Sequence, residues 1–264
     1  MDLGLRDKVA LVGGGSQGLG RAAARALAAE GAAVAIFARD MDAVRVTAAE
    51  IAHDTGARVL PLAADVTSAA DCERVVASTI AEFQALDVLV TNMGGPSYGA
   101  AADRTDDEWQ RAWELVTLSV IRLCRTAAAA MAERGAGSIV NITTPGVHQL
   151  VPENALSTVA RMATTGFTKH LATELAPRGI RINNVLPGWI DTRRVSDLAS
   201  AEATARGTTV EDVYRKQTEA IPMGRFGEAS EVADAIAFLA SSRSSYVTGT
   251  NLRVDGGWST ATAL

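Results

Sequence analysis

The chain has 264 residues, of which 48% are hydrophobic and 21% charged, a composition that supports a packed core and excludes long intrinsic disorder. Its formal net charge of −5 argues against a nucleic-acid-binding surface, which needs clustered Lys and Arg. Cys72 and Cys124 lie far apart and form neither a disulfide framework nor zinc-ligand spacing, so we expect a reducing, cytoplasmic compartment. Met1–Asp7 is too short for a signal peptide, and we expect no membrane-spanning segment.

Short apolar, β-branched runs alternate along the chain with longer Ala-rich stretches of helical period. Nearly all-apolar runs are typical of strands buried on both faces. They predict strands at 8–13, 33–37, 58–62, 87–91, 138–142, 180–186 and 250–254. The helical patterns lie at about 18–30, 42–54, 68–84, 107–133, 154–176 and 228–241. This alternation predicts a doubly wound α/β fold of the Rossmann type, a parallel sheet of about seven strands covered by helices on both faces.

Domain organisation follows from the absence of a linker-like stretch or a change in composition, and we expect one domain over 1–264. A charged, helix-prone stretch at about 192–222 follows a Pro-Gly turn and ends at Ile221-Pro222. Insertions at such a place are often lids over an active site. We therefore predict a substrate lid there, with a plain surface excursion as the alternative.

A glycine-rich turn, Gly13–Gly20, joins the first predicted strand to an Ala-rich helix. Glycines allow a backbone to approach a pyrophosphate closely, and the following helix N-terminus offers free N–H groups. The turn therefore predicts a dinucleotide site, with packing as the other explanation for the glycines. The expected contacts are Gly14, Ser16, Gln17, Gly18 and Leu19.

The end of the second predicted strand indicates which dinucleotide binds. A carboxylate at this place normally binds the ribose 2′-hydroxyl of NAD(H), but this chain has Ala38 followed by Arg39. A guanidinium suits a 2′-phosphate. We therefore expect NADP(H) in preference to NAD(H), unless Arg39 is only a solvated loop charge.

Further motifs follow in order: Asp65-Val66, Thr91–Gly94, Asn183–Gly188 with Thr192, Gly224–Gly227, Thr248-Gly249 and Val254–Gly257. Together with the glycine-rich turn they resemble the short-chain dehydrogenase/reductase family, and the match covers essentially the whole chain. The cofactor contacts that the resemblance implies are Asp65 and Val66 at the adenine, Asn92 and Gly94 at the adenosine ribose, and Pro187, Gly188, Ile190 and Thr192 at the nicotinamide.

The chain departs from the family at its catalytic positions. Family catalysis uses an Asn, a Ser and a Tyr-x-x-x-Lys motif, in which the Tyr is the general acid/base and the Lys lowers its pKa and holds the nicotinamide ribose. An alignment without gaps places these positions on Val116 for Asn, Thr144 for Ser, Ser157 for Tyr and Arg161 for Lys. We interpret this chain as a divergent relative in which all four positions are substituted.

The substituted residues keep part of that chemistry. The hydroxyls of Thr144 and Ser157 can donate to a carbonyl oxygen, and the Arg161 cation can hold the nicotinamide ribose but cannot cycle protons. A substitute acid is therefore needed. His148 is the first candidate because its ordinary pKa is near neutrality, and Glu153 is the second; each is otherwise an exposed loop residue.

These inferences predict an NAD(P)(H)-dependent oxidoreductase that acts on a carbonyl/alcohol pair of a small-molecule substrate. Two alternatives stay open: a non-catalytic relative that binds a dinucleotide or another ligand, and lyase or isomerase chemistry in which Arg161 stabilises an enolate. The resemblance also implies a homotetramer, or else a dimer, assembled through helices 107–133 and 154–176 and the segment 248–264.

Overall fold

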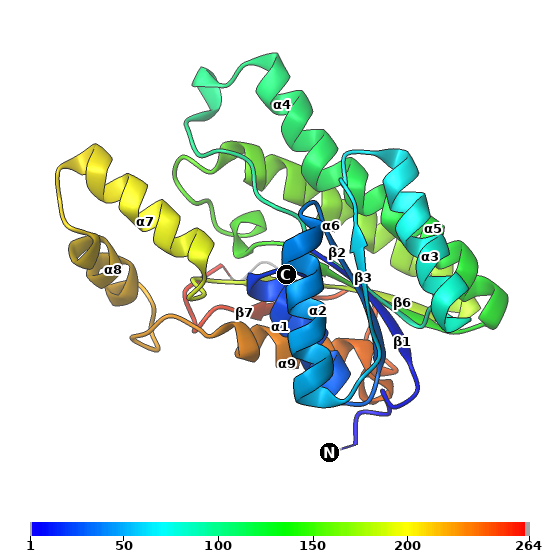
Figure 1. The fold of residues 1–264 in the computed structure, drawn as a ribbon. Coiled ribbons are helices and arrows are strands. Elements are labelled where there is room, and N and C mark those ends of the chain that lie inside the picture. The colour runs from blue at the N-terminus through cyan, green and yellow to red at the C-terminus, as the bar shows by residue number, and fades with distance from the viewer. Residues whose placement is uncertain (1, 262–264) are drawn as a thin grey trace.

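The strands form one parallel sheet in the computed structural model, which describes residues 2–261. They are β1 (Val9–Gly13), β2 (Ala33–Ala38), β3 (Val59–Ala63), β4 (Val88–Thr91), β5 (Gly137–Ile142), β6 (Ile180–Pro187) and β7 (Asn251–Val254). Their order in the sheet is β3-β2-β1-β4-β5-β6-β7 (Figure 1). The predicted doubly wound fold is confirmed. The first and last residues of each predicted strand lie within one residue of those in the structure.

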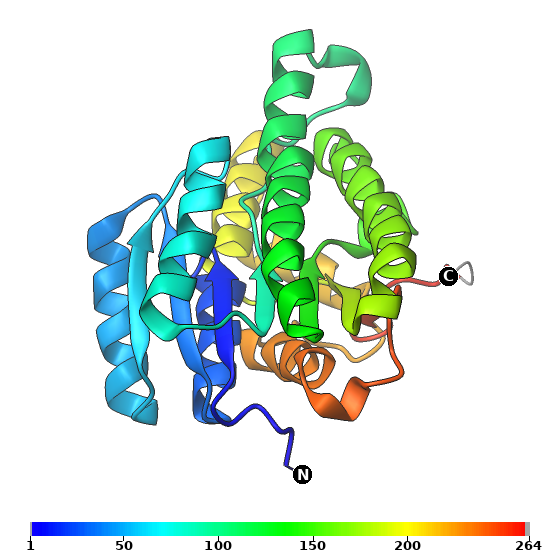
Figure 2. The ribbon, with the colours of Figure 1, turned by 90° about the vertical axis from the view of Figure 1, so that its right-hand side faces the viewer.

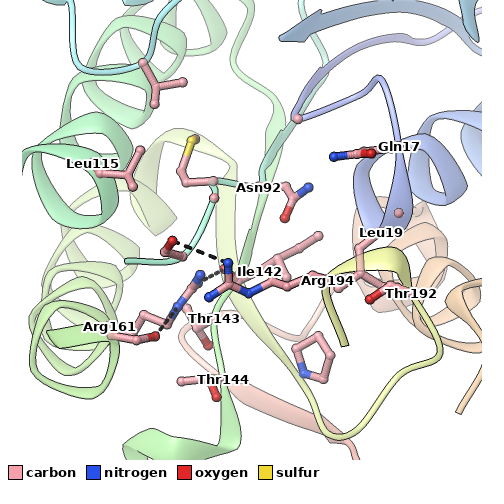
Figure 3. Close-up of a pocket in the computed structure, with 18 of the residues that line it drawn as sticks. Gln17, Leu19, Asn92, Leu115, Ile142, Thr143, Thr144, Arg161, Thr192 and Arg194 are labelled. Atoms are coloured by element: carbon pink, nitrogen blue, oxygen red, sulfur yellow. Dashed lines mark hydrogen bonds between the residues drawn. The ribbon is translucent and has the colours of Figure 1, made fainter. Parts of the chain in front are cut away.

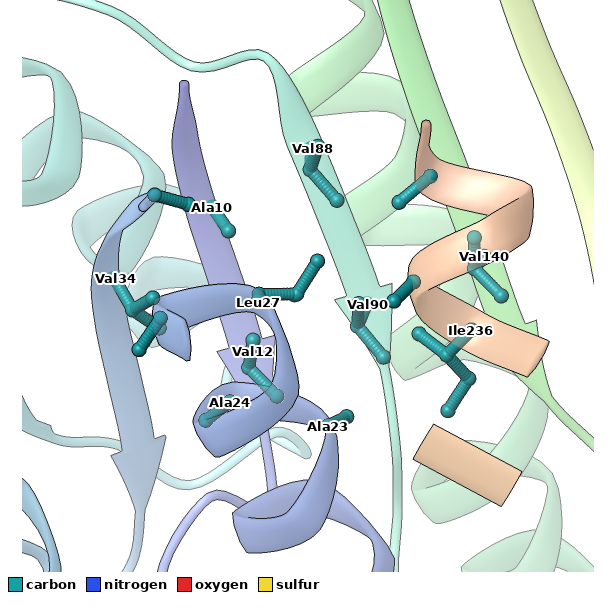
Figure 4. Packing of buried hydrophobic residues seen from close by; sticks show 14 of the residues in the cluster. Ala10, Val12, Ala23, Ala24, Leu27, Val34, Val88, Val90, Val140 and Ile236 are labelled. Carbon is teal, nitrogen blue, oxygen red and sulfur yellow. The ribbon is translucent and has the colours of Figure 1, made fainter. Parts of the chain in front are cut away.

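Helices cover both faces of the sheet (Figure 2). They are α1 (Gly18–Ala29), α2 (Met41–Thr55), α3 (Ala69–Phe83), α4 (Asp106–Ala112), α5 (Ser119–Arg134), α6 (Ala155–Leu175), α7 (Arg193–Arg206), α8 (Val210–Glu219) and α9 (Ala229–Ala240). One core lies between the sheet and α1, α2 and α9, and a second lies between the sheet and α3, α5 and α6. Small side chains let α1 approach closely, so Leu27 packs on Val12 and Val90 in the first core (Figure 4).

A π-helical turn, Trp113–Leu118, joins α4 to α5 into one continuous helical stretch. It contains Val116, which is buried. Threonine side chains tie this turn to α6, because Thr117 Oγ1 donates to the Ala160 carbonyl at 2.9 Å and Thr164 Oγ1 donates to the Val116 carbonyl at 3.4 Å. Such turns are often found at functional sites, and this one lies beside the part of α6 that carries Ser157 and Arg161.

The same stretch, Asp106–Arg134, is the one helix within residues 2–261 whose length and apolar composition would allow it to cross a membrane. Half of its most apolar window is buried inside the protein. There α5 packs against α3 and α6, as the core helix of a globular protein does.

The helices α7 and α8 occupy the predicted lid and stand away from the sheet (Figure 1). They pack on each other through a separate small core formed by Ala199, Ala203 and Val213. Tyr214 of α8 meets the ring of Phe226 with centroids 5.0 Å apart. Part of α7, including Arg194 and Leu198, lines the cleft, and a role of this segment as a substrate lid stays a prediction.

A chain of polar side chains crosses the sheet between β4 and β7. Each donates a hydrogen bond to the next, in the order Thr91, Asn141, Thr168, Asn184, Asn251 and His148. The first four are fully buried. The distances run from 2.6 Å at the Thr91 end to 3.3 Å between Asn251 Nδ2 and His148 Nε2. A buried polar group left without a hydrogen-bond partner lowers the stability of the fold by about 1–3 kcal/mol. Each of these residues therefore satisfies its neighbour, and loss of one would leave the next unpaired.

Candidate active site

A cleft of about 1420 Å³ opens at the carboxyl ends of strands β1 to β6. Ligands of open α/β sheets bind at this edge, because the loops that follow the strands converge there. The lining includes all of the predicted cofactor contacts: Gly14, Ser16, Gln17, Gly18, Leu19, Arg39, Asp65, Val66, Asn92, Gly94, Arg161, Pro187, Gly188, Ile190 and Thr192. It also includes Thr144 and Ser157. The structure therefore brings the predicted cofactor contacts together with three of the four predicted catalytic residues, Thr144, Ser157 and Arg161.

The glycine-rich turn forms a cradle at one end of the cleft. Gly14 and Gly18 have positive φ angles of 59° and 56°, which only glycine adopts without strain. A Cβ on Gly14 would lie 2.7 Å from Asn92 Nδ2. Thr47 Oγ1 holds the turn by donating to the Ser16 carbonyl at 3.0 Å. The first turn of α1 carries no acidic residue, so its N-terminus can receive a phosphate group.

Arg39 and Asp65 line the part of the cleft where the adenosine of the cofactor is predicted to bind, which we call the adenosine end. Hydrogen bonds from the backbone N–H and hydroxyl of Thr67 hold the pKa of Asp65 below its usual range, and the charge of Arg39 acts in the same direction. Arg39 itself is exposed and forms no ion pair with any residue of the described chain. An exposed, unpaired guanidinium beside Ala38 fits the 2′-phosphate of a dinucleotide, so the residues at this end match the predicted cofactor.

Ser157, Arg161 and Thr144 form the other end of the cleft (Figure 3). Arg161 Nε donates to Ser157 Oγ at 3.3 Å, and Arg161 Nη1 donates to the Ile142 carbonyl at 2.8 Å. Thr144 Oγ1 accepts from the Gly146 N–H at 3.2 Å. Both hydroxyl oxygens therefore accept a protein hydrogen bond, and each hydroxyl proton stays available to a substrate oxygen.

The side chain of Arg194 was not among the predicted site residues, yet it reaches the same end of the cleft (Figure 3). Its guanidinium makes two long hydrogen bonds, to the carbonyls of Gly95 at 3.4 Å and Pro96 at 3.3 Å. Burial and, secondly, the charge of Arg194 lower the pKa of Arg161 to about 10. In the sequence, Arg194 could have been singled out only because it lies two residues after Thr192, in the first turn of α7.

Tyr98 is a second lining residue that sequence reasoning missed as part of the site. Burial raises the pKa of its phenol, while the charges of Arg194 and Arg161 act in the opposite direction. The phenol therefore shares the cleft lining with both arginines. In the sequence, Tyr98 could have been singled out only because it lies four residues after Gly94, in the loop that follows β4.

The structure does not bring His148 into the cleft lining. Its Nε2 instead lies 3.3 Å from Asn251 Nδ2, at the end of the polar chain across the sheet. Glu153 is exposed and has a positive φ of 59°, and it does not line the cleft either. Both candidates therefore lie outside the cleft lining, and the assignment of a substitute acid to His148 stays a prediction.

Comparisons with known proteins agree with this geometry. Residues 14–259 match the family model described as Enoyl-(Acyl carrier protein) reductase. The 3-oxoacyl-[acyl-carrier-protein] reductase of Salmonella typhimurium is 36% identical over 253 residues, which cover 95% of this chain and 96% of that protein. L-Sorbose reductase from Gluconobacter frateurii, solved with NADPH and L-sorbose, superposes with a TM-score of 0.94 and 32% identity over 100% of both chains.

Actinorhodin polyketide ketoreductase, solved with NADPH as its F189W variant, superposes with a TM-score of 0.91 and 34% identity over 95% of this chain and 97% of that one. Family match and relatives thus span nearly the whole sequence, including the glycine-rich turn and the loops that line the cleft. The chain belongs to the short-chain dehydrogenase/reductase family of oxidoreductases.

Proposed function

We propose that this protein is an NADP(H)-dependent oxidoreductase that interconverts a carbonyl and an alcohol on a small-molecule substrate. The observation that carries the proposal is one continuous cleft that joins a phosphate cradle to hydrogen-bond donors at its far end. Two of the structural relatives, L-sorbose reductase and actinorhodin polyketide ketoreductase, were solved with NADPH and support the choice of cofactor. So does Arg39, which stands unpaired among the described residues where an NAD(H)-binding site would have a carboxylate.

Four groups of contacts would hold the cofactor. The cradle and the N-terminus of α1 would bind the diphosphate, Arg39 the 2′-phosphate, Asp65 the adenine, and the Pro187–Thr192 segment the nicotinamide. Bound NADP(H) supplies or accepts the hydride. The protein then has to orient the substrate carbonyl and deliver a proton to its oxygen.

The substrate end has an atypical set of groups for this task. Ser157 and Thr144 would donate hydrogen bonds to the carbonyl oxygen, and Arg161 would stabilise negative charge that develops on it and hold the nicotinamide ribose. The proton would come from a hydroxyl or from a water bound with the substrate. A missing matched acid lowers the rate by about 10²–10⁴-fold, so we expect slow turnover.

Calorimetric titration with NADPH and then NADH tests the cofactor half of this proposal. Oxidation of NADPH in the presence of a panel of ketones and aldehydes tests the second half, with Thr144→Val as the variant expected to lose activity. Micromolar binding followed by slow turnover is the expected result. Tight binding without turnover of any carbonyl would favour a non-catalytic relative, and turnover without NADPH oxidation would favour lyase or isomerase chemistry.

We further propose that the protein assembles as a homotetramer. Large apolar side chains are exposed on the helices predicted to form the interface: Val159 is 49% exposed, Met162 48% and Trp113 39%. The other predicted segment, 248–264, ends with residues 262–264, which lie outside the described chain. Light scattering after size exclusion tests this, and Met162→Glu should reduce the assembly to a smaller species.

A further inference from the structure

Positive charge gathers at the substrate end of the cleft without acidic partners. Neither Arg161 nor Arg194 forms an ion pair with a residue in the described chain. Of the acidic residues that line the cleft, Asp40 and Asp65 lie at the adenosine end. The third, Glu114, pairs with Arg122 at 3.5 Å. The charges of Arg161 and Arg194 are therefore not neutralised by the protein.

Two neighbouring guanidinium groups repel each other, and a partly buried cation without an anion is costly. Both effects are visible at Arg161, whose pKa falls to about 10 through burial and through the charge of Arg194. The cofactor ribose that Arg161 would hold is neutral and does not remove this cost. An anionic group bound between the two guanidinium groups would remove it.

The geometry leaves donors free for such a group. Arg161 uses Nε and Nη1 for its two hydrogen bonds within the described chain, so Nη2 keeps its protons for a ligand. Arg194 makes only two hydrogen bonds longer than 3.2 Å, to carbonyls of the loop after β4. Figure 3 shows the two side chains converging on the same region, beside Thr143 and Thr144. The planar forks of two arginines suit a carboxylate.

We propose that Arg161 and Arg194 bind a carboxylate of the substrate, so that the substrate is an oxo acid or hydroxy acid rather than a neutral ketone or alcohol. This inference rests on the proposed function and specifies its substrate class. Tyr98 lines the same cleft, and its phenol adds a neutral donor to the subsite, because burial raises its pKa and keeps it protonated. The carboxylate holds the substrate while the Thr144 and Ser157 hydroxyls face its carbonyl.

The cofactor diphosphate is the other anion that could reach Arg194. It already has a built cradle at Gly14–Leu19 and the N-terminus of α1, whereas Arg161 lies with the hydroxyls at the substrate end. We therefore assign the arginine pair to the substrate. The experiment has to separate these two sources of negative charge.

The test measures binding of unreactive carboxylates by isothermal titration, with and without saturating NADPH. The probes are oxamate, malonamate and succinamate, in which the carboxylate stands one, two or three bonds from an amide carbonyl, each compared with its neutral methyl ester. We expect at least one acid to bind ~10-fold more tightly than its ester, the size of one good charge-assisted contact, about 1.4 kcal/mol. Arg194→Gln should abolish this preference and change NADPH affinity less than about twofold.

Two further variants make the result specific. Arg215→Gln removes an exposed arginine from the neighbouring helix, α8, where it pairs with Asp212 and Glu219 outside the cleft lining, and it should keep the acid preference. Arg194→Lys keeps the charge but loses the planar fork and should keep only part of it.

Equal binding of every acid and its ester to the wild-type protein would overturn the inference. So would an Arg194→Gln variant that loses ~10-fold in NADPH affinity but keeps the acid preference, because the guanidinium would then serve the cofactor diphosphate. If NADPH does not bind at all, the proposed function fails, and the comparison of acid with ester on the cofactor-free protein still decides whether the arginine pair takes a carboxylate.

Discussion

Replacing Arg39 by alanine tests the cofactor assignment most directly. In the structure this guanidinium lies at the adenosine end of the cleft, close enough to Asp65 for its charge to lower the pKa of that carboxyl group. The substitution removes the cation that would face the 2′-phosphate. It also leaves the Asp65 carboxylate without this neighbouring cation, and a carboxylate repels a phosphate but accepts a hydrogen bond from a ribose hydroxyl.

The expected loss of NADPH affinity follows from the hydrogen bonds that Arg39 would make to the 2′-phosphate. Hydrogen bonds to charged groups contribute about 1.5–3 kcal/mol when buried, and the exposure of Arg39 reduces this through screening by solvent. We therefore expect a loss of about 1.5–2 kcal/mol for NADPH, or ~10–30-fold in Kd. NADH lacks the phosphate, and its Kd should change less than about twofold.

Fluorescence titration of both cofactors against wild type and Arg39→Ala measures these values. Arg45→Ala is the matched control, because Arg45 is an exposed arginine of α2 that pairs with Asp42 and does not line the cleft. Raising the ionic strength should reduce the wild-type preference for NADPH, since salt screens exposed charges. Equal losses for NADPH and NADH in Arg39→Ala would refute the assignment of the 2′-phosphate to this residue.

Three other changes test the rest of the site and the core. Combining Ser157→Tyr with Arg161→Lys should raise ketone reduction by at least ~10-fold by restoring a matched acid; no gain with several ketones would indicate a remodelled pocket. Tyr98→Phe should raise KM for the acidic substrate several-fold and leave the Kd of NADPH unchanged, whereas a fall in kcat alone would place Tyr98 elsewhere in the reaction. Asn141→Leu leaves the buried Thr91 hydroxyl without its acceptor and should lower the free energy of unfolding by about 2–4 kcal/mol; a urea-denaturation change as small as that of exposed Thr173→Val would contradict this.

The sequence was sufficient for the sheet because its strands are nearly all-apolar runs, such as Val9–Val12 in β1, that only a doubly covered sheet can bury. The glycine-rich turn was equally informative, since positive φ at Gly14 and Gly18 is a local requirement. These features depend on neighbours along the chain. They could therefore be predicted without knowing which distant segments meet.

The substrate end could be predicted only in part, because it depends on how loops meet. Tyr98 follows β4 and Arg194 begins α7, and nothing in either local sequence places them beside Arg161 of α6. His148 was predicted from its closeness to Thr144 in sequence. The short helical turn Pro145–Val147 that follows Thr144 leads the chain away from the cleft lining, and His148 contacts Asn251 instead.

The polar chain from Thr91 to His148 bears on how the sheet finds one register. In β5 and β6, Ile139 lies opposite Ile182 and Asn141 opposite Asn184. A slip of two residues between these strands would keep each side chain on its own face. In one direction it would place Ile139 opposite Ile180, another aliphatic pair, and Asn141 opposite Ile182. The same slip would carry Asn141 and Asn184 out of reach of the Thr168 hydroxyl that links them. A sheet with the wrong strand register would therefore bury side-chain amides that lack hydrogen-bond partners. A few polar residues within the aliphatic core thus help to select one register.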